Sequence, residues 1–320
     1  MRNGYFGIPR LILLVAAAVG VFNVLGGVVL VALYGLNVQN ADASVMVIVN
    51  AVSELLVMLA IPILLTRTTR KDPHAVFRIE GMHETPLGAQ LIGVPVIIAT
   101  EVVGGGLDGL WHSFLKLFPS LFDTLVGLQK QLDDLMSNVT TAHSSGELII
   151  LLIGISAVPA IAEEAFFRGF IQTHIERSGK GRPRPIVALV ITSLLFGAMH
   201  MSPLNLPGLV AMGAALGWLA YRTSDLRVSM LAHAMNNGLI VLATFYFQGS
   251  ALTSESLAKT PDVPLADSAA LIGLGLPFLF AMLFVFQRIT APLTARGNAA
   301  REIDALNRET FSPIYHDVTQ

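Results

Sequence analysis

Two adjacent glutamates and an arginine, Glu163, Glu164 and Arg168, interrupt the otherwise apolar stretch AEEAFFRGF. A charge inside a membrane is costly, and an ionisable side chain there is by default a functional-site hypothesis. Glu164 and Arg168 are four residues apart, so on a helix they share one face in the order that favours an ion pair. Glu163 points about 100° away from Glu164 and has no partner nearby in the sequence. We therefore expect Glu163 to face water, a metal ion or another polar helix.

Two further polar motifs follow on separate apolar stretches. Phe196 and His200 are four residues apart, just before Pro203, where a helix must end. His233 and Asn237 have the same spacing and can project from one helix face. Taken alone, each motif also fits a structural role: a polar cluster around the glutamates, an interfacial histidine, or hydrogen bonds that join two helices.

Together these groups have the chemistry of a hydrolase. A glutamate can act as general base, the histidines can act as bases or metal ligands, and an asparagine amide can donate to an oxyanion. The chain contains no cysteine, which excludes a disulfide, a Cys-ligated metal and a thiol nucleophile. Glu163, His200 and His233 are then the good candidate metal ligands, and three ligands leave a position open for water.

Apolar helices must position these residues, because the composition is that of a membrane protein. Hydrophobic residues make up 53% of the 320 residues and charged residues only 13%, against about 25% charged in soluble domains. Apolar runs of about 20 residues recur along the chain, which predicts an all-α, polytopic transmembrane helical bundle. We predict eight spans: Leu11–Leu36, Ser44–Thr66, Gly88–Leu110, Glu147–Ile175, Pro185–His200, Leu206–Tyr221, Val228–Phe247 and Ser268–Gln287.

The basic residues orient this bundle. Sixteen of the 20 Lys and Arg residues lie in segments that are cytoplasmic if the N-terminus is cytoplasmic, so the positive-inside rule predicts that both termini are cytoplasmic. The first apolar run is too long for a signal peptide and is expected to be retained as a helix. The net charge of -2 gives no reason to expect nucleic-acid binding. The expected surroundings are the lipid bilayer of a cell membrane.

Three segments lie outside the predicted spans. Trp111–Gly146 has the spacing of an amphipathic helix, on the outer membrane surface or across the end of the bundle. Arg67–Thr85 is basic and is expected to be a solvated loop near anionic headgroups. After Thr290 we expect a tail with a short polar helix at Ala299–Glu309. The predicted regions are an N-terminal transmembrane region (1–146), a catalytic core (147–247), and a last span with a cytoplasmic tail (248–320).

Other polar residues and glycines lie within the predicted spans. Glu54 and Glu101 are expected either to pack or to line a substrate path. Asp108 resembles part of an aspartyl intramembrane motif, but no second aspartate lies in a predicted span. The glycines at 104–106 are expected to permit close helix contact or a helix break.

A depth estimate along the helices leaves one question open. Glu163 is 14 residues from Arg177, and His200 is similarly far from its helix start, so both lie about 21–23 Å from the inner side. His233 is six residues from Arg227, a rise of about 9 Å. Either the seventh helix starts farther from the inner side than the others, or His233 lies nearer to the inner side in a tall cavity.

The three motifs, E-E-x-x-x-R, F-x-x-x-H and H-x-x-x-N, in this order on successive apolar stretches, resemble the CPBP family. This family is also called Abi or CAAX-protease-like, and it includes the eukaryotic CAAX prenyl endopeptidase and bacterial relatives linked to bacteriocin immunity. The resemblance covers about Glu147 to Phe247. It implies an eight-helix intramembrane endopeptidase, and the look of the motifs favours a bacterial cell envelope.

The resemblance also assigns roles to residues. It implies that Glu163 and His200 activate the attacking water, directly or through a metal such as zinc, and leaves open which of the two holds. It implies that His233 and Asn237 stabilise the oxyanion, and that the substrate is a membrane-associated protein or peptide. The supporting residues are Glu164, Arg168 and Phe196.

The rival interpretation is a non-enzymatic membrane protein, either a transporter or an immunity or sensor scaffold that uses the same polar cluster for binding. Transport predicts discontinuous helices and a pseudo-repeat; neither is visible, although Pro62 and Pro95 leave some room. The sequence contains no H-E-x-x-H and no G-x-S-x-G motif, which disfavours zincin and serine-hydrolase chemistry. The two interpretations differ in geometry, because an enzyme needs its polar residues to converge on one cavity.

Overall fold

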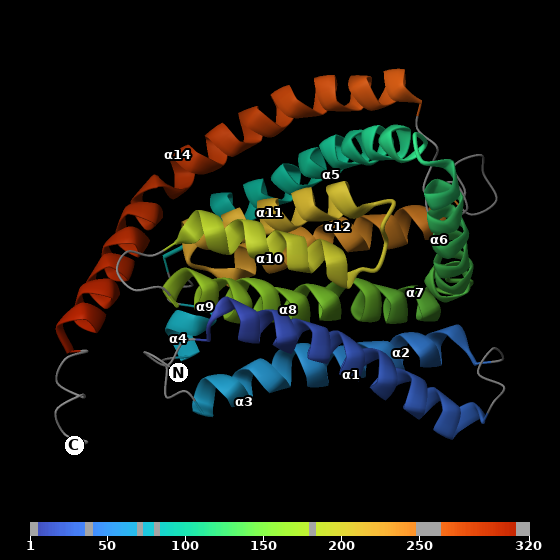
Figure 1. The fold of residues 1–320 in the computed structure, drawn as a ribbon, viewed down its shortest axis with the longest axis horizontal. Helices are drawn as coiled ribbons and strands as arrows, with labels where there is room; N and C mark the ends of the chain where they lie inside the picture. Colours follow the sequence, from blue (N-terminus) through green and yellow to red (C-terminus); the bar gives the residue numbers. More distant parts are fainter. Residues whose placement is uncertain are drawn as a thin grey trace.

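The computed structural model describes residues 6–35, 41–68, 73–79, 84–178, 184–247 and 264–311, and within these residues every regular element is a helix. Each predicted span coincides with a helix or a run of helical segments (Figure 1). The first three spans are α1 (Ile8–Tyr34), the run α2 (Ala43–Glu54), η2 (Leu55–Ala60) and α3 (Ile61–Thr68), and α5 (Leu87–Leu115). The last four are α10 (Pro185–Met199), α11 (Leu206–Thr223), α12 (Leu226–Tyr246) and α14 (Leu265–Phe311).

The fourth span is one helical run that carries the two glutamates. It consists of α7 (Ser145–Leu151), η3 (Leu152–Ala157), α8 (Val158–Glu164), η4 (Ala165–Ile171) and α9 (Gln172–Arg177). The segments η3 and η4 are π-helical turns, which often occur at functional sites. Glu163 and Glu164 end α8, and Arg168 lies in the middle of η4.

This central run is surrounded by the other helices. In Figure 1 the layer of α1–α3 lies on one side of it, and α10, α11 and α12 lie on the other, with α5 and α14 beyond them. Its aromatic side chains Phe166, Phe167 and Phe170 are fully buried. Six helices among the described residues are long and apolar enough to cross a membrane, and α10 is a shorter apolar helix. The all-α membrane bundle is therefore confirmed, whereas the count of eight crossings and the cytoplasmic termini stay predictions.

Helix α6 (Pro119–Thr140) corresponds to the amphipathic segment. Figure 1 shows that it runs across one end of the bundle, roughly perpendicular to the other helices. The side chain of Gln129 accepts a hydrogen bond from Ser202, at 2.8 Å, just after α10. Of the two alternatives for this segment, the helix therefore follows the one that caps the bundle. Its predicted first residues, from Trp111 to Leu115, instead continue α5.

The expectation of a solvated loop at Arg67–Thr85 is wrong at Arg78, although Arg67 and His74 in the same segment are exposed. Arg78 is only 3% exposed, and its Nη2 forms a 2.7 Å ion pair with the buried Glu176. Its Nε donates to the backbone carbonyl of Arg168 at 3.1 Å. A guanidinium that finds a carboxylate and a carbonyl inside the protein does not need water, so this basic residue is drawn into the bundle.

The polar segment Ala299–Glu309 is helical, as predicted, but it continues the last span and is not a separate short helix. Helix α14 continues without a break from Leu265 to Phe311, through Pro277 and Pro292. Proline removes one helical hydrogen bond, but contacts with the end of α11 hold the following turns. Thr290 accepts a hydrogen bond from Arg222 at 3.2 Å, and Thr294 donates to the carbonyl of Arg222 at 3.1 Å. The chain after residue 311 lies outside the described residues.

Two of the three consecutive glycines in α5 permit close helix contacts, as expected. A Cβ on Gly104 would lie 3.1 Å from the Cα of Gly208 in α11, and a Cβ on Gly106 would lie 2.8 Å from a backbone oxygen of α14. A Cβ on Gly105 would meet nothing within 4 Å. The first contact is between two backbones, so a side chain at position 104 would force the helices apart.

We expect Gly104→Ala to lower the free energy of unfolding by about 1–3 kcal/mol, the usual cost of overpacking. Gly105→Ala is the matched control, because it adds the same methyl group to the same helix in open space. It should leave stability unchanged or raise it by up to about 1 kcal/mol, the helix-propensity difference between glycine and alanine. Thermal unfolding of both variants in detergent measures the difference, and equal stability would contradict the close contact between α5 and α11.

Candidate active site

One cavity of about 400 Å³ collects the predicted catalytic residues. Glu163, His200, His233 and Asn237 all line it, from α8, the end of α10, and α12. Glu163 and His233 are 8% and 4% exposed, and His200 is the most open of the four. The residues thus converge on one site instead of facing lipid separately. The rest of the wall is mainly apolar and includes Ile155, Leu209, Met212 and Ile240.

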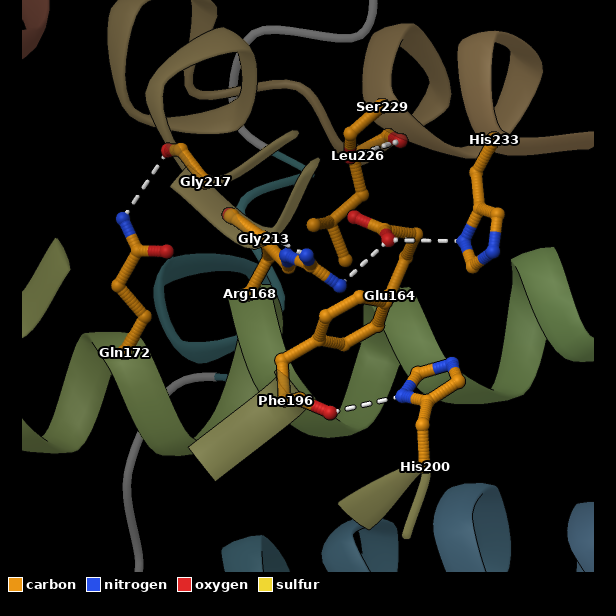
Figure 2. A network of polar contacts seen from close by, with 10 residues as sticks. All are labelled: Glu164, Arg168, Gln172, Phe196, His200, Gly213, Gly217, Leu226, Ser229 and His233. Atoms are coloured by element: carbon orange, nitrogen blue, oxygen red, sulfur yellow. Dashed lines mark hydrogen bonds and ion pairs between the residues drawn. The ribbon is translucent and has the colours of Figure 1, made fainter. Parts of the chain in front are cut away.

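Figure 2 shows a network of polar side chains in which Glu164 contacts both Arg168 and His233. Nη1 of Arg168 contacts Oε1 of Glu164 at 2.7 Å, and neither side chain is exposed. The same Oε1 lies 3.1 Å from Nδ1 of His233, at hydrogen-bonding distance. The carboxylate paired with arginine can only accept hydrogen bonds, so Nδ1 of His233 carries the proton and Nε2 is left for the cavity. Glu164 therefore does more than neutralise Arg168, because it also orients a histidine of another helix.

Phe196 connects the aromatic groups of the site. Its ring lies 4.2 Å from the guanidinium carbon of Arg168, within the range of a cation–π interaction. Its centroid is 4.6 Å from that of His200 and 6.1 Å from that of His233. The side chain is 1% exposed. Phe196 thus packs against both histidines and covers the buried arginine, which fits the supporting role that the sequence assigned to it.

His200 and Asn237 each form one hydrogen bond to a backbone carbonyl and have another polar group available for a ligand. Nδ1 of His200 lies 2.8 Å from the carbonyl oxygen of Phe196, which only accepts, so Nδ1 donates and Nε2 stays available. Nδ2 of Asn237 donates to the carbonyl of Ile155 at 3.2 Å. An amide nitrogen carries two hydrogens, so one N–H of Asn237 remains for a ligand.

Glu163 differs from the expectation in its partner. The sequence analysis expected Glu163, and not Glu164, to meet a polar group of another helix, but the contact with His233 goes to Glu164. Among the described residues, Oε2 of Glu163 has no hydrogen-bond partner. The carboxyl group of Glu54, which is 3% exposed, lies at hydrogen-bonding distance from that of Glu163. Glu163 is therefore a buried acceptor that lines a cavity and still has an unused oxygen.

The three candidate metal ligands do not fit a metal ion in this arrangement. Within the described ranges, no group of three or more His, Asp or Glu side chains is placed so that it could hold one. Glu163, His200 and His233 line the same cavity without forming a ligand set. The metal stays a prediction, and no step of the chemistry below is drawn through it.

The start of α12 is buried within the protein, although the depth of this helix in the membrane stays a prediction. Asp225 and Leu226, which precede and begin this helix, are 0% and 3% exposed. The backbone N–H of Leu226 donates to the carbonyl of Arg78 at 3.2 Å. The seventh helix therefore begins inside the folded bundle, which lets His233 reach Glu164 after only two turns.

Sequence reasoning missed the residues that hold the central run against α11. Nη2 of Arg168 donates to the carbonyl of Gly213 at 3.3 Å, and Nε2 of Gln172 donates to that of Gly217 at 3.1 Å (Figure 2). A signal was present, because Gly213 and Gly217 form a G-x-x-x-G pattern, which marks close helix packing in membranes. A Cβ at Gly217 would lie 2.8 Å from Oε1 of Gln172.

Asp108 has a structural contact that the sequence argument did not foresee. Its Oδ1 accepts a hydrogen bond from the backbone N–H of Gly208 at 2.8 Å. Gly208 lies in the first turn of α11, whose own Asn205 provides no side-chain cap. Asp108 thus satisfies an N-terminal backbone donor of α11 from a neighbouring helix.

A comparison with known protein families matches part of the chain. Residues 145–239 match the family model described as type II CAAX prenyl endopeptidase Rce1-like. The matched segment runs from the start of α7 into α12 and contains all seven predicted site residues. No curated protein and no solved structure matches the chain. The family expected from the three motifs is therefore confirmed.

Proposed function

We propose that this chain hydrolyses a peptide bond in a membrane-associated protein or peptide. Through residues 145–239 it belongs to the CAAX-protease-like family of membrane endopeptidases. The observation that carries the proposal is the convergence of Glu163, His200, His233 and Asn237 on one cavity within an apolar bundle. The cavity combines unused hydrogen-bond acceptors with unused donors, as hydrolysis of an amide requires.

Glu163 and His200 supply the acceptors in the proposed reaction. A water molecule between them donates one hydrogen to the carboxylate and one to Nε2 of the imidazole, so its oxygen lone pair is directed to the scissile carbonyl. Glu163 takes the proton as the carbon–oxygen bond forms, and it then transfers this proton to the leaving amine as the carbon–nitrogen bond breaks. General acid–base catalysis of this kind contributes about 10²–10⁴-fold to the rate.

His233 and Asn237 supply the donors. With Nδ1–H of His233 held by Glu164, the protonated imidazole presents Nε2–H to the oxyanion, and Asn237 adds its second N–H. The negative charge of Glu164 stabilises this imidazolium, and Arg168 keeps the carboxylate in place. Removing one oxyanion donor typically costs about 10²–10³-fold in rate.

Substrate trapping tests the proposal. A photo-crosslinking amino acid at Ile240, on the cavity wall, is introduced into the wild-type chain and into Glu163→Gln, and both are irradiated in their native membranes. We expect the Glu163→Gln variant to capture an intact membrane protein or peptide that the wild type converts to fragments. Capture of the same intact partner by both chains, with no fragments, would favour the non-enzymatic binding scaffold instead.

We expect peptide cleavage to persist after dialysis against a metal chelator, because the proposed reaction draws no step through a metal ion. The measurement compares initial cleavage rates before and after chelation, together with the metal content of the purified protein. Loss of activity that is restored by adding Zn²⁺ would contradict this expectation and return Glu163, His200 and His233 to a metal-binding role.

A further inference from the structure

A third carboxylate enters the cavity and has no part in the proposed chemistry. Glu101 of α5 lines the same cavity as Glu163, and its side chain is exposed. No hydrogen bond or ion pair joins it to another residue in the part of the chain that the structure describes; its closest electrostatic neighbours are Asp108 and His233. Asp108 repels it, and His233 is already held by Glu164.

Among the described residues, no lysine or arginine compensates Glu101, and His233 is a favourable electrostatic neighbour that also serves Glu164. Arg168 is paired with Glu164, and both side chains are fully buried. Among the residues that the structure describes, no lysine or arginine lines the cavity. Glu163 adds a second acidic side chain, buried and with an unpaired oxygen. The cavity thus has two acidic side chains, and the basic side chains that line it among the described residues are His200 and His233.

A carboxylate in a membrane helix requires a compensating contact, because each such charge raises the cost of inserting the helix. Asp108, seven residues further along α5, has such a contact, because it accepts a hydrogen bond from the backbone N–H of Gly208. Glu101 has no comparable contact within the protein. Its position on the cavity wall leaves the contents of the cavity as the partner that can compensate its charge.

We infer that Glu101 is a specificity residue that receives a basic side chain of the substrate next to the scissile bond. This inference rests on the proposed function and names a substrate class for it: a membrane-associated peptide with lysine or arginine close to the cleavage site. The ammonium or guanidinium forms its ion pair with Glu101. Asn236, one turn from His233 on α12, lines the same cavity and offers a neutral amide oxygen as a second acceptor.

The same charge disfavours other substrates. An acidic side chain, or a free terminal carboxylate, at that position of the peptide would be repelled by the like charge of Glu101. The cavity thus selects against acidic peptides as well as for basic ones.

Charge reversal tests the inference. The probe is a lipid-anchored peptide library, randomised over the residues around its centre, in vesicles that contain wild type, Glu101→Gln or Glu101→Lys, with cleaved sites read by mass spectrometry. For wild type we expect lysine and arginine to be enriched over glutamate and aspartate by about 10-fold or more at one position, as for a partly desolvated ion pair. Glu101→Gln should abolish the preference, and Glu101→Lys should reverse it.

Two controls separate this inference from the proposed function. Glu302→Gln, an exposed carboxylate on α14, makes the same chemical change far along the chain and should keep the wild-type preference. Glu163→Gln defines the background without catalysis. Two outcomes overturn the inference and leave the proposed function standing. In the first, cleavage depends on Glu163 but shows no preference for basic residues; in the second, Glu101→Lys does not reverse that preference. The absence of any cleavage that depends on Glu163 overturns the proposed function, and the inference with it.

Discussion

Glu163→Gln and His200→Ala are each expected to reduce peptide cleavage by about 10²–10⁴-fold, the contribution of a positioned general base. Glutamine keeps the shape of Glu163 but cannot take a proton from water. Alanine at position 200 removes Nε2, the second acceptor of the proposed water. Both side chains line the cavity, so their loss acts directly on the reacting groups.

The same two variants should still fold. Oε2 of Glu163 has no hydrogen-bond partner among the described residues, so an amide in its place breaks no contact of that oxygen. His200 lies at the end of α10 and is exposed toward the cavity, so its truncation leaves no closed void. Size-exclusion profiles and thermal unfolding in detergent check the fold, and single-turnover cleavage of the trapped substrate checks the chemistry.

The matched control for this prediction is again Glu302→Gln, which changes an exposed carboxylate far from the cavity in sequence. It should retain wild-type cleavage. Normal cleavage by both Glu163→Gln and His200→Ala would contradict the assignment of the cavity as the active site. A variant that is inactive and also unfolded would contradict the claim that these residues serve chemistry and not stability.

Arg168→Met is expected to lower the free energy of unfolding by about 3–5 kcal/mol, the usual cost of leaving one charge of a buried pair alone. The guanidinium and the carboxylate of Glu164 are both 0% exposed, so no water can replace the lost partner. The packing of Arg168 on Phe196 and its hydrogen bond to Gly213 are lost as well. Thermal or denaturant unfolding in detergent measures the loss, with the exposed Arg288→Met as the matched control.

The double variant Glu164→Gln/Arg168→Met separates charge from packing. It should be more stable than Arg168→Met alone, because no isolated charge remains in the interior. Its rate of peptide cleavage should nevertheless stay below that of the wild type by about 10²-fold or more, since a neutral glutamine cannot stabilise the imidazolium of His233. A double variant no more stable than the single one would contradict the ion pair. Full activity in the double variant would contradict the orienting role of Glu164.

Much of this site follows from local spacing in the sequence. Residues four apart on a helix must lie on one face, so the Glu164–Arg168 ion pair follows directly from the sequence. The same rule correctly placed Phe196 beside His200, where their rings are 4.6 Å apart. The order of the three motifs also indicated the family that the match at 145–239 confirms. The division into three regions and the catalytic roles stay predictions.

Contacts between distant segments were not predictable in this way. The burial of Arg78 depends on Glu176 and on a carbonyl of the central run, about a hundred residues away in sequence. Nothing near Arg78 in sequence distinguishes it from the solvated basic residues of a cytoplasmic loop. The continuity of α14 through Pro292 likewise depends on contacts with Arg222, which a local helix rule does not include.

The sequence by itself determined the membrane bundle, the four-residue pairs and the set of polar residues, because composition and helical periodicity are local properties. Only the tertiary structure decided which glutamate meets a histidine. Glu163 and Glu164 are neighbours in sequence, but their side chains point about 100° apart, so α12 can contact only one of them closely. It contacts Glu164, which therefore holds Arg168 and His233 together, and Glu163 is left on the wall of the cavity.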